Sequence, residues 1–282
     1  MVHGQSPQTR SETWRFIYDG ARDGALNMAL DMAMTQSVAA DQYPPTLRLY
    51  TWNPSAISLG YHQSEDDISL DRCRDHGIDV VWRPTGGRAI LHAAELTYAV
   101  ALPPTSAYYH ADISSVYELL SRCLVRGLKQ VRGEVDFKRA EKTPKALSRG
   151  ELSSLCYATS IRYEIAVAGK KLVGSAQRHI NGGVLQHGSI LIDKDHLRIV
   201  EFMSAKNEMW RERVQRYMEQ NTISLNQLSG HPVRLDALVA AVKAGFENEL
   251  NIHFVDTILS DDEYKTARSL LKKFSIVKTV RK

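Results

Sequence analysis

The chain has 282 residues, 43% of them apolar, and its 36 Lys and Arg against 32 Asp and Glu give a net charge of +4. This length and composition allow one large or two modest globular domains with a sizeable core. No apolar run reaches the roughly 18 residues of a membrane span, the N-terminal residues contain no apolar signal segment, and no long block of like charge indicates nucleic-acid binding. We therefore expect a cytoplasmic, monomeric protein with no membrane or nucleic-acid partner.

Strands and helices are predicted from the spacing of apolar residues. Short alternating or continuous apolar runs predict strands at 13–18, 47–52, 56–59, 79–82, 89–91, 95–101, 162–167, 171–176 and 184–192. Apolar residues at helical spacing, with capping residues, predict helices at 26–37, 64–76, 114–130, 198–220, 235–250 and 260–273. Hairpin-length links between many of the strands favour an antiparallel sheet. The polar, basic segment 138–150 is expected to be an exposed, mobile loop.

The three cysteines, Cys73, Cys123 and Cys156, are an odd number and have no C-x-x-C spacing. A disulfide framework and a zinc site are therefore both disfavoured, and we expect no metal. Cys123 lies on the apolar face of the helix predicted at 114–130, which indicates a packed, inert thiol.

A first candidate site lies in the segment from Trp82 to Val100. Its centre reads Arg83, Pro84, Thr85, Gly86, Gly87, Arg88. The glycine pair permits φ > 0 and close approach of a ligand to the backbone, and the arginines carry positive charge, so an anion-binding loop is one interpretation. The other is a simple hairpin tip between the strands predicted on either side.

A second candidate site lies about ninety residues further on. Lys171 is placed on a strand and is followed by the small residues Gly174, Ser175 and Ala176, and the pair Gly188-Ser189 comes directly after His187. Two strands cleared of large side chains, each beside a polar residue, suit a flat ligand or an extended chain.

Together these motifs resemble the lipoate-protein ligase and lipoyl/octanoyl transferase family. Three motifs of that family are present in order. They read R-P-T-G-G-R-A-I-L-H within Trp82 to His92, G-K-K-L-V-G-S-A at Gly169 to Ala176, and H-G-S-I-L at His187 to Leu191. N-M-A-L-D at Asn27 to Asp31 and G-F-E-N-E-L-N-I at Gly245 to Ile252 extend the resemblance to nearly the whole chain.

Within the family, S-S-L-C-Y before Y-E-I is similar to the LipM-type branch, which moves octanoate from acyl carrier protein to the lipoyl domain of the glycine-cleavage H protein. The match implies that Cys156 is the nucleophile. The chain departs from that branch at Ala93, where an aspartate is usual, and at 158–161, which leaves the acyl donor and acceptor open. About thirty residues follow Ile252, too few for the further domain that ATP-dependent members usually carry.

The resemblance also implies the fold and the domain organisation. We expect an α+β, biotin/lipoate protein ligase-like fold with a largely antiparallel sheet flanked by helices. The expected regions are a loose N-terminal tail at 1–12, a catalytic domain at 13–256 and a short C-terminal helical extension at 257–282.

Thioester-to-amine transfer explains the chemistry-bearing residues. A cysteine thiolate conserves the energy of a thioester donor, so no cofactor is expected. Lys171 would lower the pKa of the cysteine, hold the carbonyl oxygen and accept the proton of the attacking amine, unless it is merely a solvated strand residue. The substrate-binding residues expected around them are Arg83, Thr85, Gly86, Gly87, Arg88, His92, Gly174, Ser175, Ala176, His187 and Gly188, with His187 shaping the pocket rather than acting as acid or base.

Three other functions remain open. An ATP- and Mg²⁺-dependent lipoate ligase would need Lys171 but not Cys156, and an amidotransferase would use the cysteine but draw its acyl group from a lipoylated protein. A non-catalytic acyl-binding or scaffold subunit is disfavoured because both residues are present.

Overall fold

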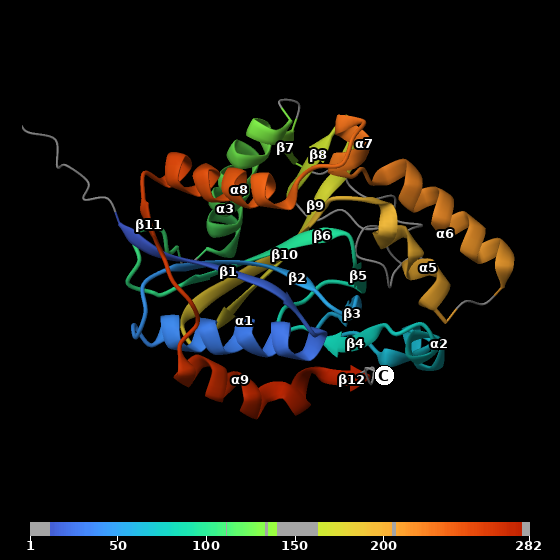
Figure 1. Cartoon of the computed structure of the whole chain (residues 1–282), viewed down its shortest axis with the longest axis horizontal. Coiled ribbons are helices and arrows are strands. Elements are labelled where there is room, and N and C mark those ends of the chain that lie inside the picture. Colours follow the sequence, from blue (N-terminus) through green and yellow to red (C-terminus); the bar gives the residue numbers. More distant parts are fainter. Residues whose placement is uncertain (1–11, 111, 133–134, 140–162, 205–206, 278–282) are drawn as a thin grey trace, which may run out of the picture.

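In this computed structural model, residues 12–110, 112–132, 135–139, 163–204 and 207–277 are described, and they form two β-sheets with helices on both faces of the larger sheet (Figure 1). The larger sheet has eight strands in the order β11 (His253–Asp256), β1 (Thr13–Arg22), β2 (Thr46–Trp52), β6 (Glu95–Leu102), β10 (Gly183–Leu191), β9 (Lys170–Ile180), β8 (Tyr163–Val167) and β7 (Asp136–Arg139). The smaller sheet has four, in the order β12 (Ser275–Val277), β4 (Asp79–Trp82), β3 (Ala56–Leu59) and β5 (Ile90–His92).

Helices cover both faces of the larger sheet. The α-helices are α1 (Gly24–Ala39), α2 (Leu70–Asp75), α3 (Ile113–Val131), α5 (Ile199–Phe202), α6 (Glu208–Asn221), α7 (Leu225–Ser229), α8 (Leu235–Leu250) and α9 (Asp261–Phe274). Two short 3₁₀ segments are η1 (Glu65–Asp67) and η3 (Lys194–Arg198).

The expected α+β fold is confirmed, and its sheets are mixed. The β11–β1–β2 edge and the β3–β4 pair are parallel, whereas the remaining neighbours are antiparallel. β4 and β5 are not partners in a hairpin, because β3 lies between them and pairs with both. The segment between β4 and β5 is therefore a connection across a sheet, and the hairpin-tip interpretation is wrong.

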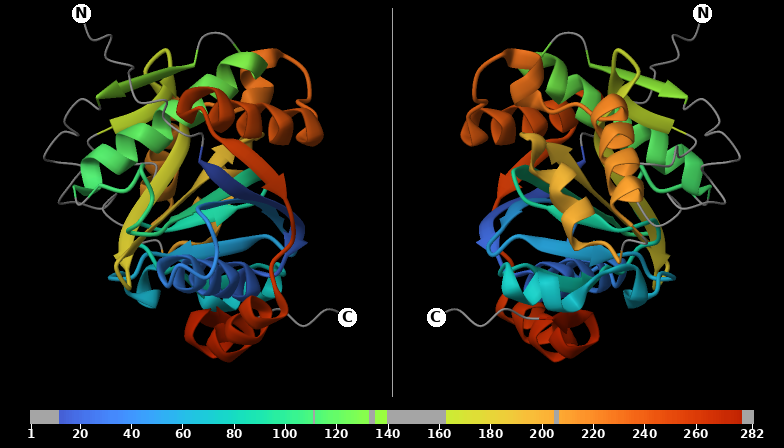
Figure 2. Two further views of the ribbon diagram at one scale, coloured as in Figure 1. Left: turned by 90° about the vertical axis from the view of Figure 1, so that its left-hand side faces the viewer. Right: turned by 90° about the vertical axis from the view of Figure 1, so that its right-hand side faces the viewer.

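The helices form layers on the large sheet because each packs with its apolar side towards the protein interior. α3 and α8 pack on one face of the large sheet, while α1 lies on the other face with α9 outside it (Figures 1 and 2). α3 and α8 cross closely at Gly127 and Gly245, where a Cβ on Gly245 would lie 2.4 Å from the Cys123 carbonyl oxygen. Glycine at this crossing lets the two helix backbones approach each other.

Helix α1 is buried on nearly all sides, as its apolar sequence predicts. It begins at the N-cap Asp23, whose carboxylate accepts the Leu26 N–H at 2.9 Å. Within it Asp31 is completely buried. A buried carboxylate is costly without partners, so its contacts define part of the site described below.

The C-terminal residues pack against the rest of the protein. α9 begins with a capping box between Ser260 and Glu263. Glu263 also accepts two hydrogen bonds from Arg15 of β1, at 2.6 and 2.9 Å, with both side chains buried. β12 then pairs with β4, which joins Ser275–Val277 to the smaller sheet.

Two helices that the sequence predicts as continuous are interrupted. The segment 64–76 divides into η1 and α2, because Ile68 forms a β-bridge with Met203 and the Ser69 N–H donates to the Phe202 carbonyl oxygen at 2.8 Å. The segment 198–220 divides at the same place, and α6 starts afresh at the N-cap Asn207. A tertiary contact therefore overrides local helix propensity at both sites.

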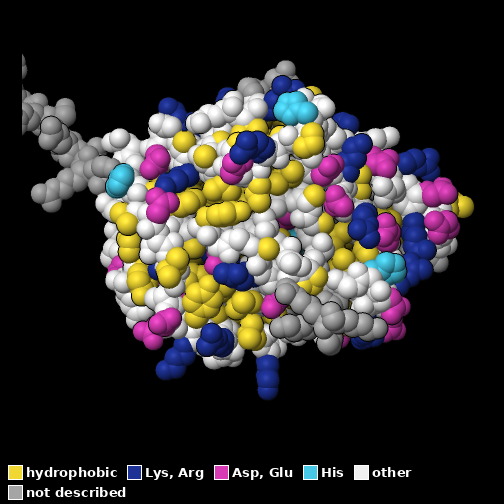
Figure 3. Space-filling view, viewed as in Figure 1, with side chains coloured by type: hydrophobic (Ala, Val, Ile, Leu, Met, Phe, Trp, Pro, Cys, Tyr) yellow, Lys and Arg dark blue, Asp and Glu magenta, His cyan; other side chains and the backbone are white. Residues whose placement is uncertain are grey.

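Among the described residues, no helix is both long enough and apolar enough to cross a bilayer. On the face drawn in Figure 3, basic and acidic side chains are interspersed. Large apolar side chains are also exposed near the β1–β11 edge, including Tyr18, Val255 and Ile258.

Candidate active site

A narrow cavity of about 30 Å³ lies between the two sheets, beside α1. It brings together residues from all three sequence motifs. Its lining consists of Met28, Tyr50, Trp52, Ser58, Arg83, Gly87, Ile90, His92, Thr97, Gly174, Ser175, Ala176, His187, Gly188 and Ser189. Most of the expected substrate-binding residues are in this set. Thr85, Gly86 and Arg88 are not, but each contacts a residue that is.

The glycine-rich loop between β4 and β5 is held by Arg83, which is 4% exposed. Its guanidinium donates to the carbonyl oxygens of Gly86, Arg88 and Ser58 and to the Ser58 hydroxyl, at 2.8 to 3.1 Å. Gly87 has φ +91°, and a Cβ there would lie 2.7 Å from an Arg83 nitrogen. All five guanidinium N–H groups therefore bind protein oxygens and organise the loop.

The loop is also fastened to the large sheet through His187 of β10. The Thr85 hydroxyl lies 2.6 Å from His187 Nε2, and Nδ1 of the same ring lies 2.9 Å from Asp31 Oδ2. Burial lowers the pKa of His187 despite the nearby Asp31 carboxylate, so the ring is neutral. Because a carboxylate only accepts, Nδ1 carries the proton and Nε2 accepts the Thr85 O–H.

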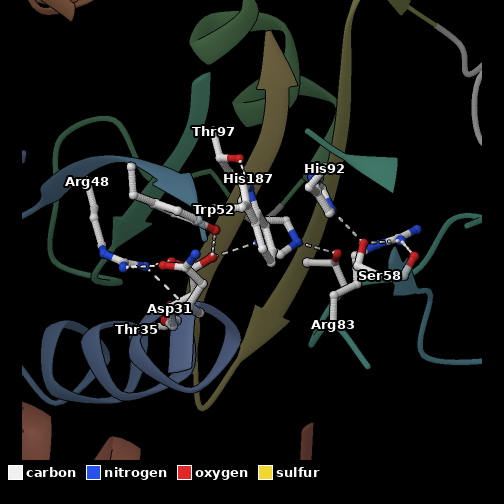
Figure 4. Close-up of polar contacts among 12 residues, drawn as sticks. Asp31, Thr35, Arg48, Trp52, Ser58, Arg83, His92, Thr97 and His187 are labelled. Atoms are coloured by element: carbon white, nitrogen blue, oxygen red, sulfur yellow. Dashed lines mark hydrogen bonds and ion pairs between the residues drawn. The ribbon is translucent and has the colours of Figure 1, made fainter. Parts of the chain in front are cut away.

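The Asp31 carboxylate is satisfied on both oxygens. Arg48 Nη1 donates to Oδ1 at 2.8 Å, and the Tyr50 hydroxyl donates to Oδ2 at 2.8 Å. Burial and the adjacent carboxylate raise the pKa of Tyr50 well above its usual value. Figure 4 shows the line that runs from Arg48 through Asp31 to His187.

A second carboxylate–imidazole–hydroxyl chain also borders the cavity. His92 Nδ1 is 2.9 Å from Glu95 Oε1 and its Nε2 is 2.7 Å from the Ser58 hydroxyl. The ring stacks on Trp52 with centroids 4.0 Å apart, and the Trp52 indole donates to Thr97 at 2.7 Å (Figure 4). Both histidine rings are therefore held at both nitrogens. His92 of β5 connects β3 to β6, and His187 of β10 connects α1 to the glycine-rich loop.

The centre of the sheet behind the cavity is closely packed around Gly188. A Cβ there would lie 2.4 Å from the Gly174 carbonyl oxygen and 2.7 Å from the Tyr98 ring. The Tyr98 hydroxyl donates to Ser175 at 2.6 Å, and burial raises its pKa to about 12. β9 and β10 are adjacent strands, so Gly188 and Ser175 are cross-strand partners.

Lys171 lies on β9 and is only 3% exposed, so it is not a solvated strand residue. It does not line the cavity. Cys156 lies outside the described residues, as does most of the loop predicted at 138–150. Cys73 and Cys123 are both buried, and burial raises the pKa of the Cys73 thiol to about 12 and that of Cys123 further. Cys123 is therefore the packed, inert thiol that its helix position predicts.

The sequence did not identify the residues that hold the two histidines, either by direct contact or through another side chain. In direct contact are Asp31, Trp52, Ser58 and Glu95. Arg48, Tyr50 and Thr97 hold these residues in turn. One signal was available, because an aspartate in an otherwise apolar helix needs a partner. Among the described residues there is no group of three or more His, Cys, Asp or Glu side chains placed to hold a metal ion.

Comparison with known proteins agrees with this geometry. Residues 23–247 match the family model of the lipoyl protein ligase A/B catalytic domain. Octanoyltransferase LipM of Kyrpidia tusciae is 34% identical over 264 residues, covering 93% of this chain and 96% of that protein. Octanoyltransferase LipM of Bacillus subtilis is 36% identical over 257 residues, covering 90% and 92%.

Solved structures share the fold. A bipartite lipoate protein ligase from Thermoplasma acidophilum superimposes with a TM-score of 0.73 at 22% identity, covering 93% of both chains. A lipoate-protein ligase A bound with ATP gives 0.72 at 23% identity, covering 93% of this chain and 95% of that one. The chain belongs to the lipoyl protein ligase A/B catalytic-domain family. Within that family, its sequence places it among the octanoyltransferases.

Proposed function

We propose that this enzyme takes an octanoyl group from acyl carrier protein, holds it as a thioester on Cys156, and passes it to a lysine of a lipoyl-domain protein such as the glycine-cleavage H protein. The supporting observation is the narrow cavity between the sheets, where the three motifs meet. Met28, Ile90 and Trp52 give that cavity apolar surface, and at about 30 Å³ it must widen to admit an eight-carbon chain.

The proposed reaction has two acyl-transfer steps. The Cys156 thiolate attacks the donor carbonyl, the donor C–S bond breaks, and the carrier leaves as its thiolate. The amine of the acceptor lysine then attacks the new thioester, its C–S bond breaks, and an amide forms as the amine loses a proton. Exchange between two thioesters is nearly isoenergetic, so we propose that neither ATP nor Mg²⁺ takes part.

Lys171 and the β9 backbone are assigned the polar roles. The ammonium group of Lys171 would favour the Cys156 thiolate and give its proton to the departing carrier thiolate. The neutral amine so formed would then accept the proton of the attacking amine, which restores the ammonium. Gly174, Ser175 and Ala176 of β9 line the cavity, and we assign the developing oxyanion to the backbone of this stretch.

The two histidine chains are assigned a positioning role. A neutral His187 that already accepts the Thr85 hydroxyl fixes the glycine-rich loop over the cavity rather than moving a proton. His92, stacked on Trp52, is a rigid part of the cavity wall. Rigid placement of the acyl group beside the nucleophile is itself a large part of the rate enhancement.

Modification of an apo lipoyl domain tests the proposal. We expect transfer from octanoyl-acyl carrier protein without ATP, and loss of that transfer in Cys156→Ala and Lys171→Ala. Modification that requires lipoate, ATP and Mg²⁺ and survives Cys156→Ala would identify a ligase instead. Transfer only from an already octanoylated lipoyl domain would identify an amidotransferase.

A further inference from the structure

A second depression, of about 250 Å³, opens on the surface beside the glycine-rich loop. We call it the β9 depression, because the end of β9 supplies much of its wall. Its lining residues are Met32, Gln36, Tyr61, Arg178, His179, Ile180, Asn181 and Lys273. Nothing in the mechanism above uses it.

The β9 depression carries positive charge. Arg178 and Lys273 contribute cations, and no Asp or Glu is among its described lining residues. Arg178 is held in place, since its Nη1 donates to the Pro84 carbonyl oxygen at 2.8 Å and its guanidinium lies 4.1 Å from the Tyr61 ring centroid. A fixed guanidinium beside a lysine in a concave surface suits a phosphate-type anion.

The β9 depression and the acyl cavity are joined by one strand and one loop. Gly174 to Ala176 of β9 line the cavity, and Arg178 to Ile180 line the depression. At the rise of a β-strand, Arg178 lies about 7 Å from Ala176 and about 13 Å from Gly174. The Tyr61 N–H also donates to the Thr85 carbonyl oxygen at 3.0 Å, so the loop borders both.

We propose that the β9 depression binds the phosphodiester of the prosthetic arm on which the donor carries its acyl thioester. This inference rests on the proposed use of a carrier-protein donor. A 4′-phosphopantetheine arm has an anionic phosphodiester at one end and the thioester about 13 bonds away, a span of roughly 16 Å when extended. The arm is therefore long enough to reach from Arg178 to the part of β9 that lines the cavity. The acceptor lysine carries no phosphate, so the depression distinguishes the donor from the acceptor.

The test compares three donors: octanoyl-acyl carrier protein, octanoyl-4′-phosphopantetheine and octanoyl-pantetheine, which lacks the phosphate. For Lys273→Glu we expect kcat/KM to fall about tenfold with the two phosphate-bearing donors and to remain unchanged with octanoyl-pantetheine. Discharge of the acylated enzyme to the lipoyl domain is expected to be unaffected. The matched control is Lys272→Glu, an exposed neighbour on α9 outside the depression, with wild-type values throughout.

The other outcomes are distinguishable. Equal loss with all three donors, or no loss with any, overturns the phosphodiester assignment. Loss with the carrier protein but not with octanoyl-4′-phosphopantetheine also overturns it, because the contact is then with the protein surface of the carrier. If the wild-type enzyme transfers octanoate from none of the donors, the proposed function itself is wrong.

Discussion

Replacing Thr85 with valine tests whether the His187 chain fastens the glycine-rich loop. Valine has nearly the shape of threonine but lacks the hydroxyl that lies 2.6 Å from His187 Nε2. The ring is 5% exposed, so Nε2 would be left buried without a donor, at a cost of about 1–3 kcal/mol. For a chain of this size, each kcal/mol lowers Tm by about 2–4 °C.

The assay combines thermal or denaturant unfolding with octanoyl-transfer kinetics. Because a loosened loop misplaces the acyl group, kcat/KM is expected to fall roughly tenfold to a hundredfold. Thr85→Ser keeps the hydroxyl and is the matched control, with stability and activity near wild type. A Thr85→Val protein as stable and as active as Thr85→Ser would refute the reasoning.

A double-mutant cycle isolates the contact itself. With His187→Gln as the second change, residues that act as one unit show a coupling of about 0.5–3 kcal/mol in unfolding free energy. Additive losses would show that Thr85 and His187 stabilise the protein independently.

Three further predictions concern packing, pH and the chain end. Gly188→Ala places a Cβ 2.4 Å from the Gly174 carbonyl oxygen, so β9 and β10 must separate. We expect the unfolding free energy in denaturant to fall by about 1–3 kcal/mol and octanoyl transfer to be lost, whereas wild-type stability would show that the two strands separate without cost. Burial lowers the pKa of His196 to about 4 from 6.5, so the unfolded chain takes up a proton first as pH falls. The unfolding free energy that His196 contributes is therefore complete above pH 6.5 and falls by about 3 kcal/mol towards pH 4. In His196→Gln this fall in stability is expected to be smaller, and an unchanged pH profile of stability in that variant would contradict the assignment. Glu263→Gln leaves Arg15 buried without its charge partner and is expected to lower the unfolding free energy by about 3–5 kcal/mol, measured by calorimetry. A loss below about 1 kcal/mol would show that the Arg15–Glu263 pair contributes little to stability.

Local patterns predicted most of the regular structure. The apolar sequence of α1 required burial, and the structure buries it between the large sheet and α9. The strands at β2, β3, β4 and β6 lie close to their predicted bounds. The parallel strand β11 was missed because only Phe254 of its residues is buried, so it has no recognisable apolar pattern.

The interrupted helices and the polar clamps depend on contacts that a local pattern does not contain. Ile68 and Met203 pair across the chain, and this pairing divides two predicted helices. His187 and Asp31 are 156 residues apart in the sequence, so no local pattern predicts that they contact each other. The glycine and histidine motifs predicted residues that the structure brings together around the cavity, whereas the acidic residues that orient the histidines could be identified only from the structure.

The central claim is most directly tested by the mass of the intact protein. Wild-type enzyme and Cys156→Ala are each incubated with octanoyl-acyl carrier protein without ATP, and an apo lipoyl domain is then added. The account predicts one octanoyl adduct on the wild type, none on the variant, and discharge of the adduct to the lipoyl domain. Modification of the lipoyl domain at equal rates by both proteins, with no adduct on either, would contradict the acyl-cysteine mechanism.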